Sequence, residues 1–164
     1  MKKVIAVVAL SSFALSGAAN AREWEQWGSD ISNGVWGYNS DGVRTGDMLT
    51  ATYDKNGNRN IYMHDGIDIG NCPVWLRDGK TSTEVIMVNE QPVSFKKDCT
   101  YVKESDMHLI TFYPRTIKGI SFLFDSMIKG KNIIFKKTDE HAKNIDFSTM
   151  GFRKHWESLN GDAL

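Results

Sequence analysis

The chain has 164 residues, of which 41 % are hydrophobic and 24 % charged, and its 20 Lys and Arg residues balance 20 Asp and Glu residues. This composition is typical of a globular protein and excludes a disordered or collagen-like chain. The formal net charge of zero excludes the basic excess with which nucleic-acid-binding proteins neutralise phosphates. A chain of this length is expected to form one domain.

The N-terminus has the three parts of a secretory signal peptide. Lys2 and Lys3 give a positive start, an apolar run covers residues 4–14, and small residues lead to Ala21, after which signal peptidase is expected to cut. The apolar run is shorter than the roughly 20 residues that a transmembrane helix needs. We therefore expect residues 1–21 to be removed and residues 22–164 to form a single β-rich domain. The protein is then periplasmic or secreted, with no membrane span after the signal is removed.

Cys72 and Cys99 are the only cysteines in the chain. An even pair of cysteines in an exported protein is normally a disulfide, because the compartment is oxidising. The alternative is a reactive or metal-bound thiol pair. The chain has no C-x-x-C motif, and two cysteines cannot complete a zinc site without histidines at matched spacing. The sequence therefore predicts a disulfide between Cys72 and Cys99.

The first half of the chain after the signal predicts short strands and tight turns. Alternating bulky residues predict a strand over residues 34–38, with a turn following at residues 39–42. Residues 48–53 and 60–64 are β-rich and flank Asn56-Gly57, a dipeptide typical of hairpin turns.

Three further strands are expected before the first helix. They cover residues 83–88, 92–95 and 107–113, and Pro114 ends the last of them.

Helical spacing of apolar residues predicts a helix over residues 115–129. Thr116 is placed to cap its start, and Gly130 is placed to end it. Residues 132–136 and 144–147 then predict a hairpin with a polar tip.

A second helix is expected to start at Ser148 or Thr149, because Phe152, Trp156 and Leu159 share one helical face. Taken together, the elements predict a mainly β fold. The expected architecture is an antiparallel β-sandwich or rolled sheet with two short helices in the C-terminal half.

Residues that could carry chemistry gather only around His64. A histidine beside Asp65 and Asp68 is typical of acid–base groups or metal ligands. Consecutive residues of a strand point to opposite faces, however, and no nucleophile accompanies the group. We therefore predict no catalytic residue, no metal site and no cofactor. The alternative is a small secreted hydrolase that uses His64, Asp65 and Asp68.

Tryptophan is the second candidate source of function, with five residues in the chain. Trp24, Trp27 and Trp36 lie close together near the start of the expected mature chain, where exposed aromatic rings would form a binding surface. The alternative is a structural role, with Trp36 and Trp75 in the core and with Trp24 and Trp27 covering the edge of the sheet.

The C-terminal half resembles the invasion-associated locus B family of exported bacterial proteins. The resemblance is carried by Val88-Asn89-Glu90-Gln91-Pro92-Val93-Ser94-Phe95, Cys99, the expected helix with Gly130-Lys131-Asn132-Ile133 after it, and Ser148-Thr149-Met150-Gly151-Phe152. The second cysteine that the family carries shortly after the first is absent, since Thr100-Tyr101-Val102 follow Cys99. The resemblance implies an exported β-sandwich without known catalytic residues.

These observations predict an exported bacterial envelope or secreted binding protein without catalytic activity. Its partner is expected to be another protein of the envelope or of a host. Besides the hydrolase, the sequence leaves one more alternative, a proteinaceous inhibitor of an envelope-degrading enzyme.

Overall fold

The structure is a computed structural model that describes residues 26–28, 33–65, 72–73, 76, 79–102, 107–130, 132–136 and 144–159. The predicted signal peptide, residues 1–21, lies outside the described residues. So do Trp24, Asp68, Trp75 and His141.

The first three strands form an antiparallel meander: β1 (Gly34–Tyr38), β2 (Arg44–Tyr53) and β3 (Arg59–Asp65). The predicted hairpin between β2 and β3 is confirmed. Asp54 accepts hydrogen bonds from the backbone N–H groups of Asn56 and Asn58, at 2.8 and 2.9 Å. Gly57 takes the left-handed conformation, with φ at 78°, that this tight turn requires.

The next three strands form a second antiparallel meander: β4 (Ser82–Val88), β5 (Gln91–Val102) and β6 (Met107–Pro114). β5 has 12 residues and is much longer than the predicted strand over residues 92–95. The reason is its pairing with β6, which continues without interruption from Phe95 to Val102. Polar residues in that stretch remove the alternating hydrophobic pattern by which a strand is recognised in the sequence.

The C-terminal half contains α1 (Ile117–Ile128), β7 (Ile133–Lys136), β8 (Ile145–Phe147) and α2 (Phe152–Ser158). The predicted cap of α1 is confirmed, because Thr116 Oγ1 accepts the backbone N–H of Gly119 at 3.1 Å. α2 starts later than predicted. The left-handed conformation of Gly151, with φ at 80°, places the helix start after it. No helix among the described residues has the length and hydrophobicity needed to cross a bilayer.

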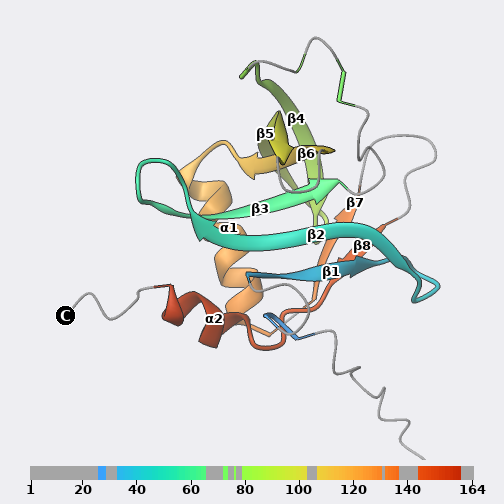
Figure 1. Ribbon diagram of the computed structural model, residues 1–164. Helices are drawn as coiled ribbons and strands as arrows, with labels where there is room; N and C mark the ends of the chain where they lie inside the picture. Colours follow the sequence, from blue (N-terminus) through green and yellow to red (C-terminus); the bar gives the residue numbers. More distant parts are fainter. Residues whose placement is uncertain are drawn as a thin grey trace, which may run out of the picture.

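The eight strands close into one antiparallel barrel in the order β1-β2-β3-β6-β5-β4-β7-β8, and β8 pairs with β1 (Figure 1). The expectation of a sandwich was therefore wrong, whereas the rolled sheet was the correct alternative. A sandwich needs two separate sheets with free edges. Here β7 bridges β4 and β8, and β8 bridges β7 and β1, so the sheet returns to its first strand.

The barrel interior is filled by apolar side chains. Its largest fully buried members within the strands are Leu49, Ile61, Met63, Ile86, Phe95, Ile110, Phe135 and Phe147. An eight-stranded barrel is just wide enough for side chains of this size, so the described interior is a packed core and not a ligand cavity. α1 contributes Leu123 and Met127 to this core, and α2 contributes Phe152 and Trp156.

The predicted disulfide is confirmed. Cys72 and Cys99 are bonded, with 6.0 Å between their Cα atoms, and Cys72 is 2 % exposed. The bond attaches the connection between β3 and β4 to the long strand β5. It therefore restrains a part of the chain that does not belong to any strand.

Candidate functional site

The outer surface of the barrel holds the candidate site, because the interior is filled. Leu49, Ile61, Met63, Ile110 and Phe112 point inward from β2, β3 and β6 and are at most 2 % exposed. Alternation along each strand therefore turns the residues between them outward. These outward residues are Thr50, Tyr62, His64, Thr111 and Tyr113. Asp98 on β5 is the cross-strand partner of Thr111 and faces outward with it. We call these six residues the His64 cluster.

His64 lies at the centre of this cluster, between two threonines. Its Nε2 is 2.9 Å from Thr50 Oγ1 on β2, and its Nδ1 is 3.1 Å from Thr111 Oγ1 on β6. A neutral imidazole has one donor and one acceptor, so one hydroxyl donates to the ring while the other accepts from it. Burial lowers the pKa of His64 to about 4, which keeps the ring neutral at pH 7.

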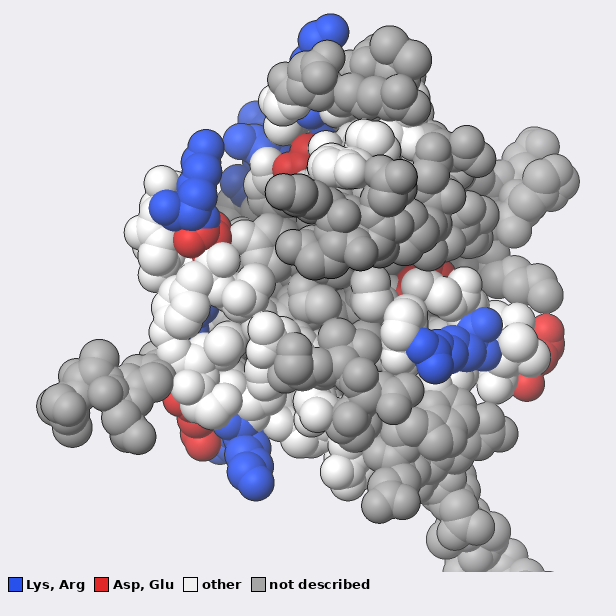
Figure 2. All heavy atoms as spheres, viewed as in Figure 1, with Lys and Arg blue, Asp and Glu red and all other residues white. Residues whose placement is uncertain are grey.

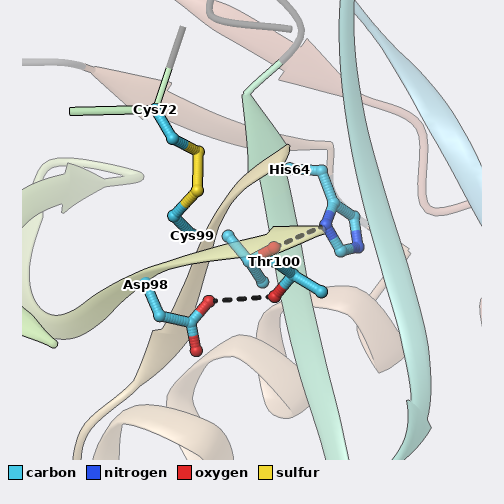
Figure 3. Close-up of a disulfide and its surroundings, with 6 residues drawn as sticks. His64, Cys72, Asp98, Cys99 and Thr100 are labelled. Carbon is cyan, nitrogen blue, oxygen red and sulfur yellow. Dashed lines mark hydrogen bonds between the residues drawn. A yellow bond between two sulfur atoms is a disulfide. The ribbon is translucent and has the colours of Figure 1, made fainter. Parts of the chain in front are cut away.

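Two tyrosines and a carboxylate extend the cluster toward β5. The rings of Tyr62 and Tyr113 have centroids 5.9 Å apart, and Tyr62 stacks on His64 at 6.4 Å. Burial raises the pKa of Asp98, and the hydrogen bonds that this carboxylate accepts from Thr100 and Tyr113 oppose the rise. Figure 3 shows the contact between Asp98 and Thr100, together with His64 and the Cys72–Cys99 bond, whose Cys99 follows Asp98 on β5.

The arrangement limits what the His64 cluster can do chemically. Both ring nitrogens of His64 are engaged by threonine hydroxyls, and the ring is half-shielded from solvent. A general base needs a pKa near the working pH, whereas the pKa of His64 lies well below 7. The cluster is therefore suited to holding a rigid, mainly aromatic and hydroxyl-bearing surface rather than to moving protons at neutral pH.

The predicted group of His64, Asp65 and Asp68 is not brought together within the described residues. His64 points to the outer face of β3, whereas Asp65 points inward and is 8 % exposed. This follows from the alternation of side chains along a strand. Asp68 lies outside the described residues. The partners of His64 are hydroxyl groups from neighbouring strands, which a search for nearby residues in the sequence could not have found.

The three tryptophans predicted as a binding surface do not share one environment. Trp27 is 7 % exposed, donates from Nε1 to the backbone oxygen of Ser148 at 2.8 Å, and packs edge-on against Phe152. Its ring is part of the core and offers almost no surface to a partner. Trp36 is partly exposed on the outer face of β1, and the guanidinium of Arg44 lies 3.5 Å from its ring centroid. Trp24 lies outside the described residues.

Trp36 and the His64 cluster belong to one continuous row of outward side chains. Trp36 on β1 pairs with Met48 on β2, and Met48 pairs with His64 on β3. The row continues from His64 through Thr111 to Asp98. We call Trp36, Met48 and the His64 cluster the outer row. Register alone assembles it, since these residues come from five strands.

The remaining histidines of the described chain make separate contacts. His108 packs against Tyr101, with ring centroids 5.1 Å apart, and His155 Nε2 lies 3.2 Å from the backbone oxygen of Ala51. Within the described residues, no three His, Cys, Asp or Glu side chains are grouped closely enough to hold a metal ion.

Among the described residues on the visible face, charge does not single out one region. Figure 2 shows Lys, Arg, Asp and Glu groups scattered around its edge, with both signs close to each other.

Comparisons of the chain with protein-family models, with curated protein sequences and with solved structures found no significant match.

Proposed function

We propose that this protein is an exported bacterial envelope or secreted binding protein that recognises another protein through the outer row and has no catalytic activity. The observation that carries the proposal is the continuity of Trp36, Met48, Tyr62 and Tyr113 on the outward face of adjacent strands. Aromatic residues and methionine are enriched in the cores of protein interfaces, and Trp, Tyr and Arg dominate their energetic hot spots.

The packed interior supports this proposal. An eight-stranded barrel that binds a small ligand usually does so in its lumen, but phenylalanine and branched aliphatic side chains fill the described interior of this one. Recognition by the described part of the chain therefore depends on its outer surface.

The rigidity of the outer row also supports a binding role. His64 is held by two threonines, and Arg44 lies over the Trp36 ring, so several side chains of the row have fixed positions. Side chains fixed before binding lose less conformational entropy when a partner docks. A fixed aromatic surface is thus suited to recognition of a folded protein.

The proposed compartment is supported by two observations. Residues 1–21 have the composition of a signal peptide, and the Cys72–Cys99 disulfide is compatible with an oxidising compartment outside the cytosol. Membership of the invasion-associated locus B family is part of the same proposal. It depends on the sequence segments of the C-terminal half alone.

The experiment is capture of partner proteins from an envelope extract with the wild-type chain and with Trp36→Ala. We expect the variant to recover at least about tenfold less of the partner, because truncation of an aromatic hot spot costs about 2 kcal/mol or more of binding energy. Ile117→Ala is the matched control. Ile117 is 82 % exposed at the start of α1 and does not belong to the outer row, so its loss should leave recovery unchanged.

Thermal unfolding of each variant accompanies the capture. The proposal requires Trp36→Ala to keep a cooperative transition close to that of the wild type while recovery falls. Equal recovery with both variants would show that the outer row is not the binding surface.

A further inference from the structure

A polar hollow of about 370 Å³ lies where β7 and β8 close the barrel against β1, whereas the outer row extends from β1 in the opposite direction, toward β2. Tyr38, Asp146 and Ile134 line it side by side, because Tyr38 pairs with Asp146 and Asp146 pairs with Ile134. The turn at Asn39 and Ser40 forms another part of its wall, and Asn132, Asn144 and Ser148 complete it. Its size is that of a small-ligand pocket.

Among the described residues that line the hollow, Asp146 is the only charged one. Its Oδ2 accepts one hydrogen bond from Asn132 Nδ2 at 3.2 Å. Its Oδ1 is buried and has no hydrogen-bond partner within the described part of the chain. Burial raises the pKa of this carboxyl group, and the Asn132 hydrogen bond opposes the rise only in part. No Lys or Arg among the described residues lines the hollow, so none of them balances the charge that Asp146 carries when it is ionised.

Two cations of the neighbouring described strands, Arg44 and Lys136, do not line the hollow. Arg44 pairs with Tyr38 along the strands, but its guanidinium lies over the Trp36 ring. Lys136 ends β7 and is exposed, and it is not part of the lining. Desolvation of a carboxylate that no described residue compensates is unfavourable, and a bound cation would relieve this cost.

We propose that this hollow binds a guanidinium or ammonium group of a ligand, with Asp146 as its counter-charge. The exposed oxygen of the Asp146 carboxylate accepts from the cation, and because the charge is shared by both carboxylate oxygens, the buried oxygen is compensated as well. Asn144 is exposed and also lines the hollow, where its amide oxygen accepts a second N–H.

A cation is favoured over a neutral donor by the charge of Asp146. A hydrogen bond between two charged groups is roughly twice as strong as one between neutral groups. We therefore expect a cationic ligand to bind about tenfold more tightly than a neutral ligand of the same shape. This inference does not depend on the proposed function, because the hollow and the outer row occupy different parts of the barrel surface.

The test compares N-acetyl-arginine amide with N-acetyl-citrulline amide, whose side chain has almost the same shape but no charge. Each is titrated into the purified protein while backbone amide resonances are recorded by NMR. We expect the arginine compound to shift the resonances of Asp146, Ile134 and Ser148 with an affinity about tenfold above that of the citrulline compound. Calcium chloride in a separate titration should leave these resonances unchanged.

Asp146→Asn keeps the shape of the side chain and removes its charge, so it should abolish the preference for arginine. Asp125→Asn makes the same chemical change on the exposed side of α1 and should preserve the preference. Equal affinity of the two compounds for the wild type, shifts confined to other residues, or binding of calcium at Asp146 would each overturn the proposal. The comparison of ligands on the wild type remains decisive if Asp146→Asn does not fold.

Discussion

His64 on β3 and Thr111 on β6 are direct cross-strand partners, and Nδ1 of His64 lies 3.1 Å from Thr111 Oγ1. Thr111 is 6 % exposed although it belongs to the outward face of its strand. A protonated imidazole has two donors and no acceptor, so it cannot keep a contact in which a threonine hydroxyl donates to the ring. The pair therefore connects the protonation state of one side chain to the packing of three strands.

Acidification from pH 6.5 to pH 4 is expected to destabilise the protein through His64. The pKa of this histidine is lowered to about 4 in the folded state by burial, whereas in the unfolded chain it keeps its ordinary value of 6.5. Between these values the unfolded chain binds the proton first, so the contribution of His64 is complete above pH 6.5 and is lost toward pH 4. The shift corresponds to about 3 kcal/mol, to be measured by urea unfolding at several pH values.

His64→Gln is the control for this pH dependence, since glutamine does not titrate. Because only the wild type loses the contribution of His64, the variant should show a smaller loss of stability on acidification than the wild type. Asp98 and Asp146 act in the opposite direction in both proteins, because burial raises their pKa values and the folded state gains protons more readily as the pH falls. The same pH slope in both proteins would contradict the assignment.

Removal of the disulfide is expected to lower the free energy of unfolding by about 3.5 kcal/mol. Cys72 and Cys99 are 27 residues apart, and the bond restricts the unfolded chain over this loop. The double variant Cys72→Ser with Cys99→Ser should unfold at a lower urea concentration, and dithiothreitol should have a comparable effect on the wild type. If reduced and oxidised protein unfold at the same midpoint, the bond does not contribute to stability.

Trp27→Ala is expected to cost about 3–5 kcal/mol, the range for truncation of a large buried aromatic side chain. The substitution removes the contact with Phe152 and leaves the backbone oxygen of Ser148 without its donor. Trp36→Ala, on the outer face, should cost clearly less. Chemical unfolding of the two variants side by side measures the difference, and an equal or reversed order would show that Trp27 is not a core residue.

Gly37→Ala is expected to destabilise the barrel at the junction of β1 and β8 by about 1–3 kcal/mol. A Cβ atom at this position would lie 2.5 Å from Ile145 Cγ2 and 2.9 Å from a ring carbon of Phe147, both of which belong to the core. Their side chains cannot move away without disturbing neighbouring core residues. A thermal transition at the wild-type temperature would mean that the strands separate at little cost.

Local features of the fold could be predicted from the sequence because short-range physics determines them. The Asn56-Gly57 hairpin, the cap at Thr116 and the end of α1 at Gly130 each depend on a few consecutive residues. The closure of the barrel could not be predicted in this way. Nothing near Gly37 indicates that its strand pairs with Phe147, and nothing near His64 indicates Thr111.

The candidate sites show the same division. Asp146 lies in a predicted hairpin, but its environment depends on Tyr38 and Asn39, which join it only when β8 meets β1. Trp27 and Trp36 are equally aromatic in the sequence, yet α2 covers the first with Phe152 and leaves the second outside. Distant chain segments thus decide which side chain is buried and which is available.

The pairing of Gly37 with Phe147 joins residues about 110 positions apart. During synthesis, β1 emerges early but finds its second neighbour only when almost the whole polypeptide is available. Until then one side of β1 has unpaired backbone groups and can associate with other chains. A protein with this topology is thus expected to fold slowly and after translation. A chaperone that covers the unpaired edge of β1 would increase the amount of folded protein.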